Sequence, residues 1–146
     1  MNWKAHFFLS LFLYGITLFA FGIFNYFFDL HVIIAGFLIT IAYGLLPDID
    51  HDISKINNII EILFLGTALA GLISFFVFEK KELVIVSSFL VGLILATKFL
   101  RHRGITHTIR FGLISALPLW FANPFFVLFA FIAFLSHLLA DLQIKL

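Results

Sequence analysis

The sequence predicts an all-α integral membrane protein, a polytopic bundle of about six transmembrane helices. Of its 146 residues, 63% are hydrophobic and only 12% are charged, against about 25% charged residues in soluble domains. Its apolar stretches also reach the lengths of roughly 17 to 25 residues that helices need to cross a bilayer. Such helices satisfy every backbone hydrogen bond internally, whereas the strands of a membrane β-barrel would show polar alternation.

Six apolar segments are expected to span the membrane. In chain order they cover residues 7–28, 30–46, 59–78, 83–100, 105–121 and 125–142. The first follows Lys4 and continues to Phe28, well beyond the core of a signal peptide, so we expect it to be retained. Turn-forming sequences separate the segments, and no linker is long enough to divide domains. The chain is therefore expected to form a single transmembrane domain over residues 1–146.

The fifth span must include polar residues to reach a membrane-crossing length. Its uninterrupted apolar part, residues 111–122, is too short to cross about 30 Å of hydrocarbon. We therefore expect this helix to begin near Gly104, with Thr106 and His107 in its first turns, where polar groups are costly unless partnered or functional. Pro118 is expected to kink the same helix.

Alternation of six spans places most ionisable residues at one membrane face. The face of the N-terminus would hold His6, the loop at 48–52, and the segments HRGITH (102–107) and SHLLAD (136–141), with His31 on the opposite face. Most of the basic residues fall on the first face: Lys4, Lys55, Lys98, Arg101, Arg103, Arg110 and Lys145. The positive-inside rule makes that face cytoplasmic, which predicts an inner or plasma membrane protein with a cytoplasmic N-terminus.

The composition also restricts the chemistry. Because the chain has no cysteine, disulfides, thiolate metal sites and thiol nucleophiles are excluded, and a metal must be held by histidine and carboxylate. A net charge of +1 provides no basic surface of the kind that binds nucleic acid.

The segment LLPDIDHDIS (45–54) concentrates charge in an otherwise apolar chain. Asp48, Asp50 and Asp52 surround His51, and three carboxylates this close repel one another unless cations are present. Asp48 and His51 would share a face of a helical turn, whereas Asp48 and Asp50 would share a face of an extended segment. A simpler interpretation makes Asp48 a helix cap and the rest a solvated loop, which suits Asp52 best.

Two further segments pair histidine with other polar groups. His137 and Asp141 stand at i and i+4, so both project from one face of a helix. This spacing suits metal binding, although a simple hydrogen bond at a helix end is the alternative. In HRGITH, Gly104 can turn the chain, which would leave His102 in a loop and His107 on the first helical turn.

Arginine near these histidines can serve in two ways. We interpret Arg101 as a basic residue that flanks a membrane span. Arg103 lies between two candidate ligands, where a guanidinium can hold a phosphate or a carboxylate through paired hydrogen bonds.

Together these motifs resemble a known family. LPDIDH, HRGITH and SHLLAD, with the histidine of AHFFLSL, are similar to segments of the YdjM-like family of LexA-regulated, predicted inner-membrane metal-dependent hydrolases, and the resemblance covers nearly the whole chain. Thr108 stands where serine is usual and keeps the hydroxyl. By this resemblance, the polar signature of the family falls on His6, Asp48, Asp50, His51, His102, Arg103, His107, His137 and Asp141.

We therefore expect a metal-dependent hydrolase. The expected metal ligands are His6, Asp48, Asp50, His51, His102, His107, His137 and Asp141. This number exceeds the needs of one tetrahedral zinc and suits a two-metal centre, so we expect two ions, or at least one, with Zn²⁺ favoured and Mn²⁺ or Fe²⁺ as alternatives. Metal would activate water, Asp50 and His102 are the candidate proton-transfer groups, and Arg103 would hold an anionic group.

The expected substrate is lipid-like, because the site would open where acyl chains meet headgroups, and Arg103 favours a phosphoester. One alternative is a divalent-metal transporter or sensor. Transporters carry ionisable residues near the bilayer midplane, whereas the mid-span positions here are apolar. Another alternative is a structural subunit, which would hold no metal. The sequence leaves the oligomeric state open.

Overall fold

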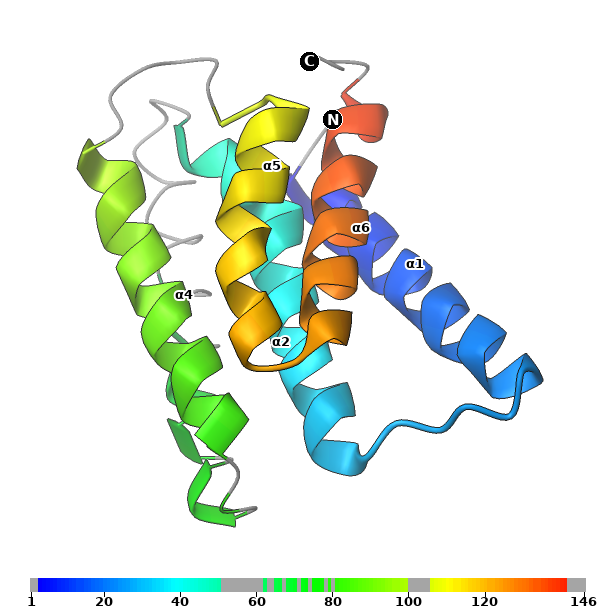
Figure 1. The fold of residues 1–146 in the computed structure, drawn as a ribbon. Helices are drawn as coiled ribbons and strands as arrows, with labels where there is room; N and C mark the ends of the chain where they lie inside the picture. The colour runs from blue at the N-terminus through cyan, green and yellow to red at the C-terminus, as the bar shows by residue number, and fades with distance from the viewer. Residues whose placement is uncertain are drawn as a thin grey trace.

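The computed structural model describes residues 3–50, 62, 65–66, 68–70, 72–73, 75–77, 79, 81–99 and 106–141. Within these residues the chain is helical, as predicted. The elements are α1 (Trp3–Ile23), α2 (Leu30–Leu45), the 3₁₀ helix η1 (Leu46–Asp50), α4 (Lys81–Phe99), α5 (Ile109–Ala116), the 3₁₀ helix η2 (Leu117–Phe121) and α6 (Pro124–Ala140). Figure 1 shows them arranged as a bundle in which α2, α4 and α6 run in one direction and α1 and α5 run in the other.

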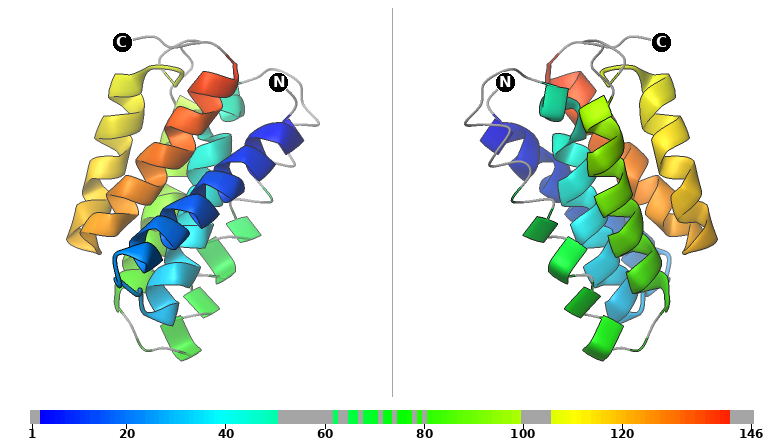
Figure 2. Two further views of the ribbon diagram at one scale, coloured as in Figure 1. Left: turned by 90° about the vertical axis from the view of Figure 1, so that its right-hand side faces the viewer. Right: turned by 90° about the vertical axis from the view of Figure 1, so that its left-hand side faces the viewer.

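Helix α2 occupies the centre of the bundle. It packs against α1, α4 and α6, while α5 and η2 pack on α6 (Figures 1 and 2). Small residues on α2 allow this close packing: a Cβ atom at Gly36 would lie 2.7 Å from the ring of Phe129 on α6. Close approach of helices at small residues is a common basis of packing inside membranes. The largest fully buried side chains therefore come from α2, α6 and their neighbours, among them Tyr43, Phe126 and Phe134.

The first helix ends at Ile23, five residues earlier than the predicted end at Phe28. Asn25 adopts a left-handed backbone with a φ of 57°. The Tyr26 N–H donates to the Phe21 carbonyl and the Asn25 N–H to that of Gly22, both at 3.0 Å. This is the Schellman arrangement, which satisfies the last carbonyls of a helix and stops it. Residues 24–29 consequently form a non-helical connection to α2.

The start predicted for the fifth span is wrong. Helix α5 begins at Ile109, and Thr106 and His107 lie in the turn before it. The Thr108 hydroxyl caps the helix by accepting from the Phe111 N–H at 3.2 Å, and such a cap satisfies an N–H that lacks an intrahelical partner. The expected interruption at Pro118 takes the form of a change from α-helix to the 3₁₀ helix η2.

Two helices among the described residues are long and apolar enough to cross a membrane: Lys4–Ile23, with 20 residues, and Leu30–Asp48, with 19 residues. Shorter apolar helices cover Ala68–Val77, Val84–Leu93, Ile109–Phe121 and Pro124–Ala140. The six-span arrangement therefore stays a prediction.

Candidate metal centre

Four polar side chains meet at one end of the bundle. His6 comes from the first turns of α1, Asp48 from η1, and His137 and Asp141 from the end of α6. One ligand atom from each of the four lies within 4.8 Å of all the others. Figure 1 shows the start of α1, the end of α2 and the end of α6 at the same end of the bundle. The predicted convergence of these residues on one face is therefore observed for these four side chains.

Local structure places each of these residues. The 3₁₀ turn of η1 follows α2 without a break, so Asp48 lies just beyond the end of the buried central helix. Asp141 is the C-cap of α6, and its N–H donates to the His137 carbonyl at 3.1 Å. The pair thus stays one turn apart, as the i, i+4 spacing predicts.

Three distances within this group are close to those between neighbouring ligands of one metal ion. His6 Nε2 lies 3.1 Å from Asp141 Oδ1, while His137 Nε2 lies 3.4 Å from Asp141 Oδ2 and 3.5 Å from Asp48 Oδ1. In a tetrahedral site with bonds of about 2.0 to 2.2 Å, neighbouring ligand atoms stand roughly 3.3 to 3.6 Å apart. Both Nε2 atoms are buried without an aligned hydrogen bond, so the carboxylates approach them without forming one.

A backbone contact defines the orientation of His137. Its Nδ1 lies 2.9 Å from the Gly44 carbonyl oxygen, which can only accept, so Nδ1 carries the proton. In the neutral ring, Nε2 is then an acceptor that faces two carboxylate oxygens. A cation between these three acceptors would satisfy all of them, and a backbone carbonyl behind the histidine is a typical support for a metal-bound imidazole.

The histidines form the inner side of the site and the aspartates form its outer side. The rings of His6 and His137 stack with centroids 3.9 Å apart and 19° between their planes, and both side chains are fully buried. The side chains of Asp48 and Asp141 keep 14% and 15% of their surface exposed. The group is therefore in contact with solvent on the carboxylate side.

A family model described as YdjM inner membrane protein matches residues 1–145. The chain belongs to this family. No curated protein and no solved structure matches it. The resemblance predicted from the motifs is confirmed, and the family description agrees with a membrane location and with contact between the apolar helices and lipid.

In this YdjM family member, His107 lies beside the four-residue group. Its ring centroid stands 5.7 Å from that of His137, at an interplanar angle of 70°. Thr106, which is buried, places its Oγ1 3.3 Å from His107 Nδ1. This histidine therefore borders the centre and is not one of the four grouped ligands.

Several predicted site residues lie outside the described part of the chain: the side chain of Asp50, and His51, His102 and Arg103. Their roles stay predictions. The backbone through Asp48 and Asp50 is 3₁₀ helical, which excludes the extended alternative for this pair. His31 lies near the start of α2, at the other end of that helix from Asp48, as expected.

Two residues that support the site were missed from the sequence. Gly44 provides the carbonyl for His137, and a Cβ atom at this position would lie 2.5 Å from Ser10 Oγ. Ser10 is the residue through which α1 contacts α2 here. Their spacing from the candidate ligands could have indicated both residues. Ser10 follows His6 by four residues, and Gly44 precedes Asp48 by four residues, which is one helical turn in each case.

Proposed function

We propose that this YdjM family protein is a membrane-embedded, metal-dependent hydrolase that acts on a lipid-like phosphoester. The observation that carries the proposal is the buried Nε2 of His137, which faces Asp48 and Asp141 while the Gly44 carbonyl holds the opposite nitrogen. A divalent cation satisfies this arrangement, and buried polar groups rarely persist without such compensation.

His6, Asp48, His137 and Asp141 would hold the ion. Their mixed nitrogen and oxygen donors favour Zn²⁺, with Mn²⁺ or Fe²⁺ as alternatives. The four described ligands account for one ion, and a second ion would draw on Asp50, His51, His102 or His107. When bound, the metal would lower the pKa of a water molecule towards about 7 and polarise the scissile ester.

The protein's own residues would move the protons. Asp48 or Asp141, whose carboxylates are partly exposed, would accept the proton of the attacking water through an oxygen that does not bind the metal. His107, which lies beside the centre and contacts the Thr106 hydroxyl, would protonate the leaving ester oxygen. Asp50 and His102 are the other candidates for this role. Arg103 would hold the phosphoryl oxygens through its planar pair of donors.

A lipid-like substrate agrees with the surroundings of the site. Phe8, two residues after His6, is 66% exposed, and Phe12, Ile16 and Phe19 continue this exposed apolar face along α1. In a bilayer this face would contact acyl chains. The centre lies at the end of the same helix, so a substrate with an apolar tail and an anionic head can reach it from the membrane.

Hydrolysis by metal-loaded protein tests the proposal. Detergent-solubilised protein should release product from at least one of phosphatidic acid, other phospholipids, polyprenyl phosphates and simple carboxylic esters. The Asp141→Asn variant should be at least about 100-fold slower, because it removes a ligand charge. If the metal-loaded protein hydrolyses none of these compounds but moves metal into liposomes, the transporter alternative replaces the hydrolase.

The cytoplasmic position of the site is also part of the proposal, and labelling tests it. Cysteine introduced at Lys4 should react with a membrane-impermeant reagent only from the cytoplasm, and cysteine at Lys81 only from outside, because these exposed residues begin helices at opposite ends of the bundle. The natural chain, which has no cysteine, is the unlabelled control. Labelling of both variants from one side would contradict the alternating topology.

A further inference from the structure

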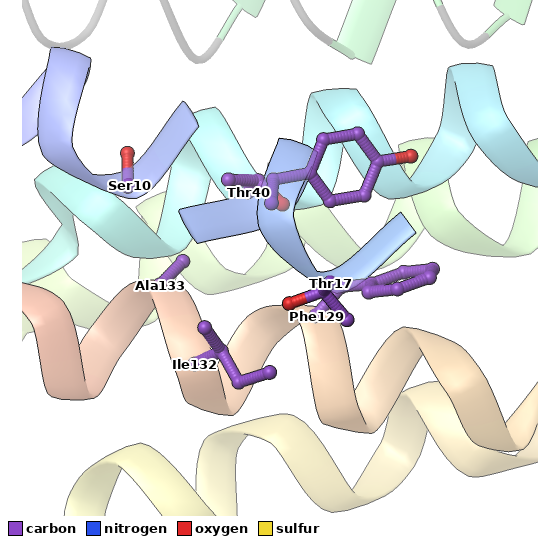
Figure 3. Close-up of a pocket in the computed structure, with 7 residues that line it drawn as sticks. Ser10, Thr17, Thr40, Phe129, Ile132 and Ala133 are labelled. Carbon is purple, nitrogen blue, oxygen red and sulfur yellow. The ribbon is translucent and has the colours of Figure 1, made fainter. Parts of the chain in front are cut away.

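Helices α1 and α5 lie on opposite sides of α6 (Figures 2 and 3). Figure 3 shows Ser10 and Thr17 of α1 on one side of a narrow gap and Phe129 and Ala133 of α6 on the other. This gap does not admit even a water molecule, so α1 and α6 are closed against each other. The outer faces of α1 and α5 are therefore two separate surfaces, and a membrane lipid would contact the protein on them.

The outer face of α5 and η2 is an apolar stripe. On the inner face, Gly112 and Ala116 are buried, and a Cβ atom at Gly112 would overlap the ring of Phe134 on α6. The residues of the outer face recur at helical spacing. They are between 44% and 87% exposed, and comprise Leu113, Ile114, Leu117, Trp120 and Phe121. This apolar stripe faces away from the rest of the bundle.

Arg110 lies at the end of the apolar stripe that is nearer the metal centre. It belongs to the first turn of α5, three residues after His107, which borders the centre. Its side chain is exposed, and no carboxylate among the described residues forms an ion pair with it. A guanidinium stays charged and binds a phosphate through paired hydrogen bonds. Arg110 can therefore hold an anionic group at this end of the bundle.

The apolar stripe has the length of a lipid acyl chain. With a rise of about 1.5 Å per residue in α5 and about 2.0 Å in the 3₁₀ helix η2, Trp120 lies about 16 Å along the axis from Arg110. The hydrocarbon of one leaflet is about 15 Å thick, half of the bilayer core. A phospholipid with its phosphate at Arg110 would therefore place an acyl chain along the stripe as far as Trp120.

We infer that Arg110 and the apolar stripe of α5 bind an anionic phospholipid, with the guanidinium on the phosphate and an acyl chain along the stripe. Charge complementarity favours a lipid over a second copy of this chain. Two copies joined at this face by a two-fold axis along the membrane normal would bring two Arg110 side chains together. The inference goes beyond the proposed function, because no metal ligand and no proposed proton-transfer group belongs to this site.

Trp120 can report which lipid occupies the apolar stripe. Trp3 is the other tryptophan of the chain, so Trp3→Phe leaves Trp120 as the single fluorophore. This variant is reconstituted into phosphatidylcholine vesicles, with chelator present to prevent hydrolysis. The vesicles contain a small, equal fraction of either phosphatidic acid or phosphatidylcholine with brominated acyl chains, because bromine quenches a tryptophan that it contacts. Brominated phosphatidic acid should be enriched at Trp120 about fivefold over brominated phosphatidylcholine, the factor expected for one basic side chain near an anionic lipid.

Two further substitutions locate the phosphate. Arg110→Gln in the Trp3→Phe background should reduce quenching by phosphatidic acid to the level of phosphatidylcholine. Lys4→Gln is the matched control and should keep the enrichment. Lys4 is also basic and exposed at the metal-centre end of the bundle, but it lies on α1, across α6 from α5.

Equal quenching by the two brominated lipids in the Trp3→Phe protein overturns the inference. An enrichment that persists in Arg110→Gln, or that is lost equally in Lys4→Gln, also overturns it, because the phosphate is then not held at Arg110. If neither lipid quenches Trp120, protein covers the apolar stripe and the inference fails. Hydrolysis by metal-loaded protein is measured separately, so failure of the lipid site and failure of the hydrolase are distinguishable.

Discussion

Replacement of His137 by alanine is expected to remove the bound metal and, with it, any hydrolytic activity. The change deletes the Nε2 atom that faces Asp48 and Asp141 and leaves the two carboxylates without their shared partner. Loss of a supporting residue around a metal typically weakens affinity 10- to 100-fold, so loss of a ligand should weaken it by more than about 100-fold. Elemental analysis of purified protein and competition with a metal-binding dye would measure the change.

His31→Ala is the matched control, because His31 lies near the start of α2, away from the centre. That variant should keep its metal. A chelator should lower the thermal stability of the natural protein, since a metal present at 100 times its dissociation constant stabilises the folded state by about 2.7 kcal/mol. The same chelator should not affect His137→Ala. Full metal content in His137→Ala, or an unchanged unfolding temperature of the natural protein in chelator, would refute the metal centre.

Gly44→Ala is expected to weaken metal binding, although Gly44 is not itself a ligand. The new Cβ would lie 2.5 Å from Ser10 Oγ and 2.8 Å from Ser10 Cβ, closer than such atoms can pack. Relief of this overlap would push α1, and therefore His6, away from the other ligands. We expect about 1 to 3 kcal/mol of destabilisation, as for other overpacked interiors, and a 10- to 100-fold weaker metal affinity.

A second substitution can restore the spacing. Ser10→Gly removes both atoms that the new methyl group meets, so the double variant Gly44→Ala with Ser10→Gly should recover most of the lost metal affinity. Gly15→Ala on α1 is the control, because a Cβ atom there meets nothing within 4 Å and alanine favours the helix. If Gly44→Ala binds metal as tightly as the natural protein, the contact between α1 and α2 does not position His6.

The apolar segments of the sequence predicted the helical class and most of the helix positions. The errors of this prediction lie at helix ends. Helix α1 stops at Ile23 because Asn25 accepts a left-handed backbone, and α5 starts at Ile109 because the Thr108 hydroxyl caps it. Length and hydropathy do not detect such ends, since one side chain or one φ angle determines each of them.

His137 and Asp141 could be paired from the sequence, because residues four apart on a helix share a face whatever surrounds them. Alternation of spans also predicted that His6 and Asp48 would lie at the same end as this pair. How closely the four approach depends on helix packing, and the close approach of Ser10 on α1 to Gly44 on α2 is part of that packing. The proton position on His137 likewise depends on the Gly44 carbonyl, 93 residues away in the sequence. Local spacing along one helix is a property of the chain, whereas distances between helices follow from side-chain volumes that meet only after folding.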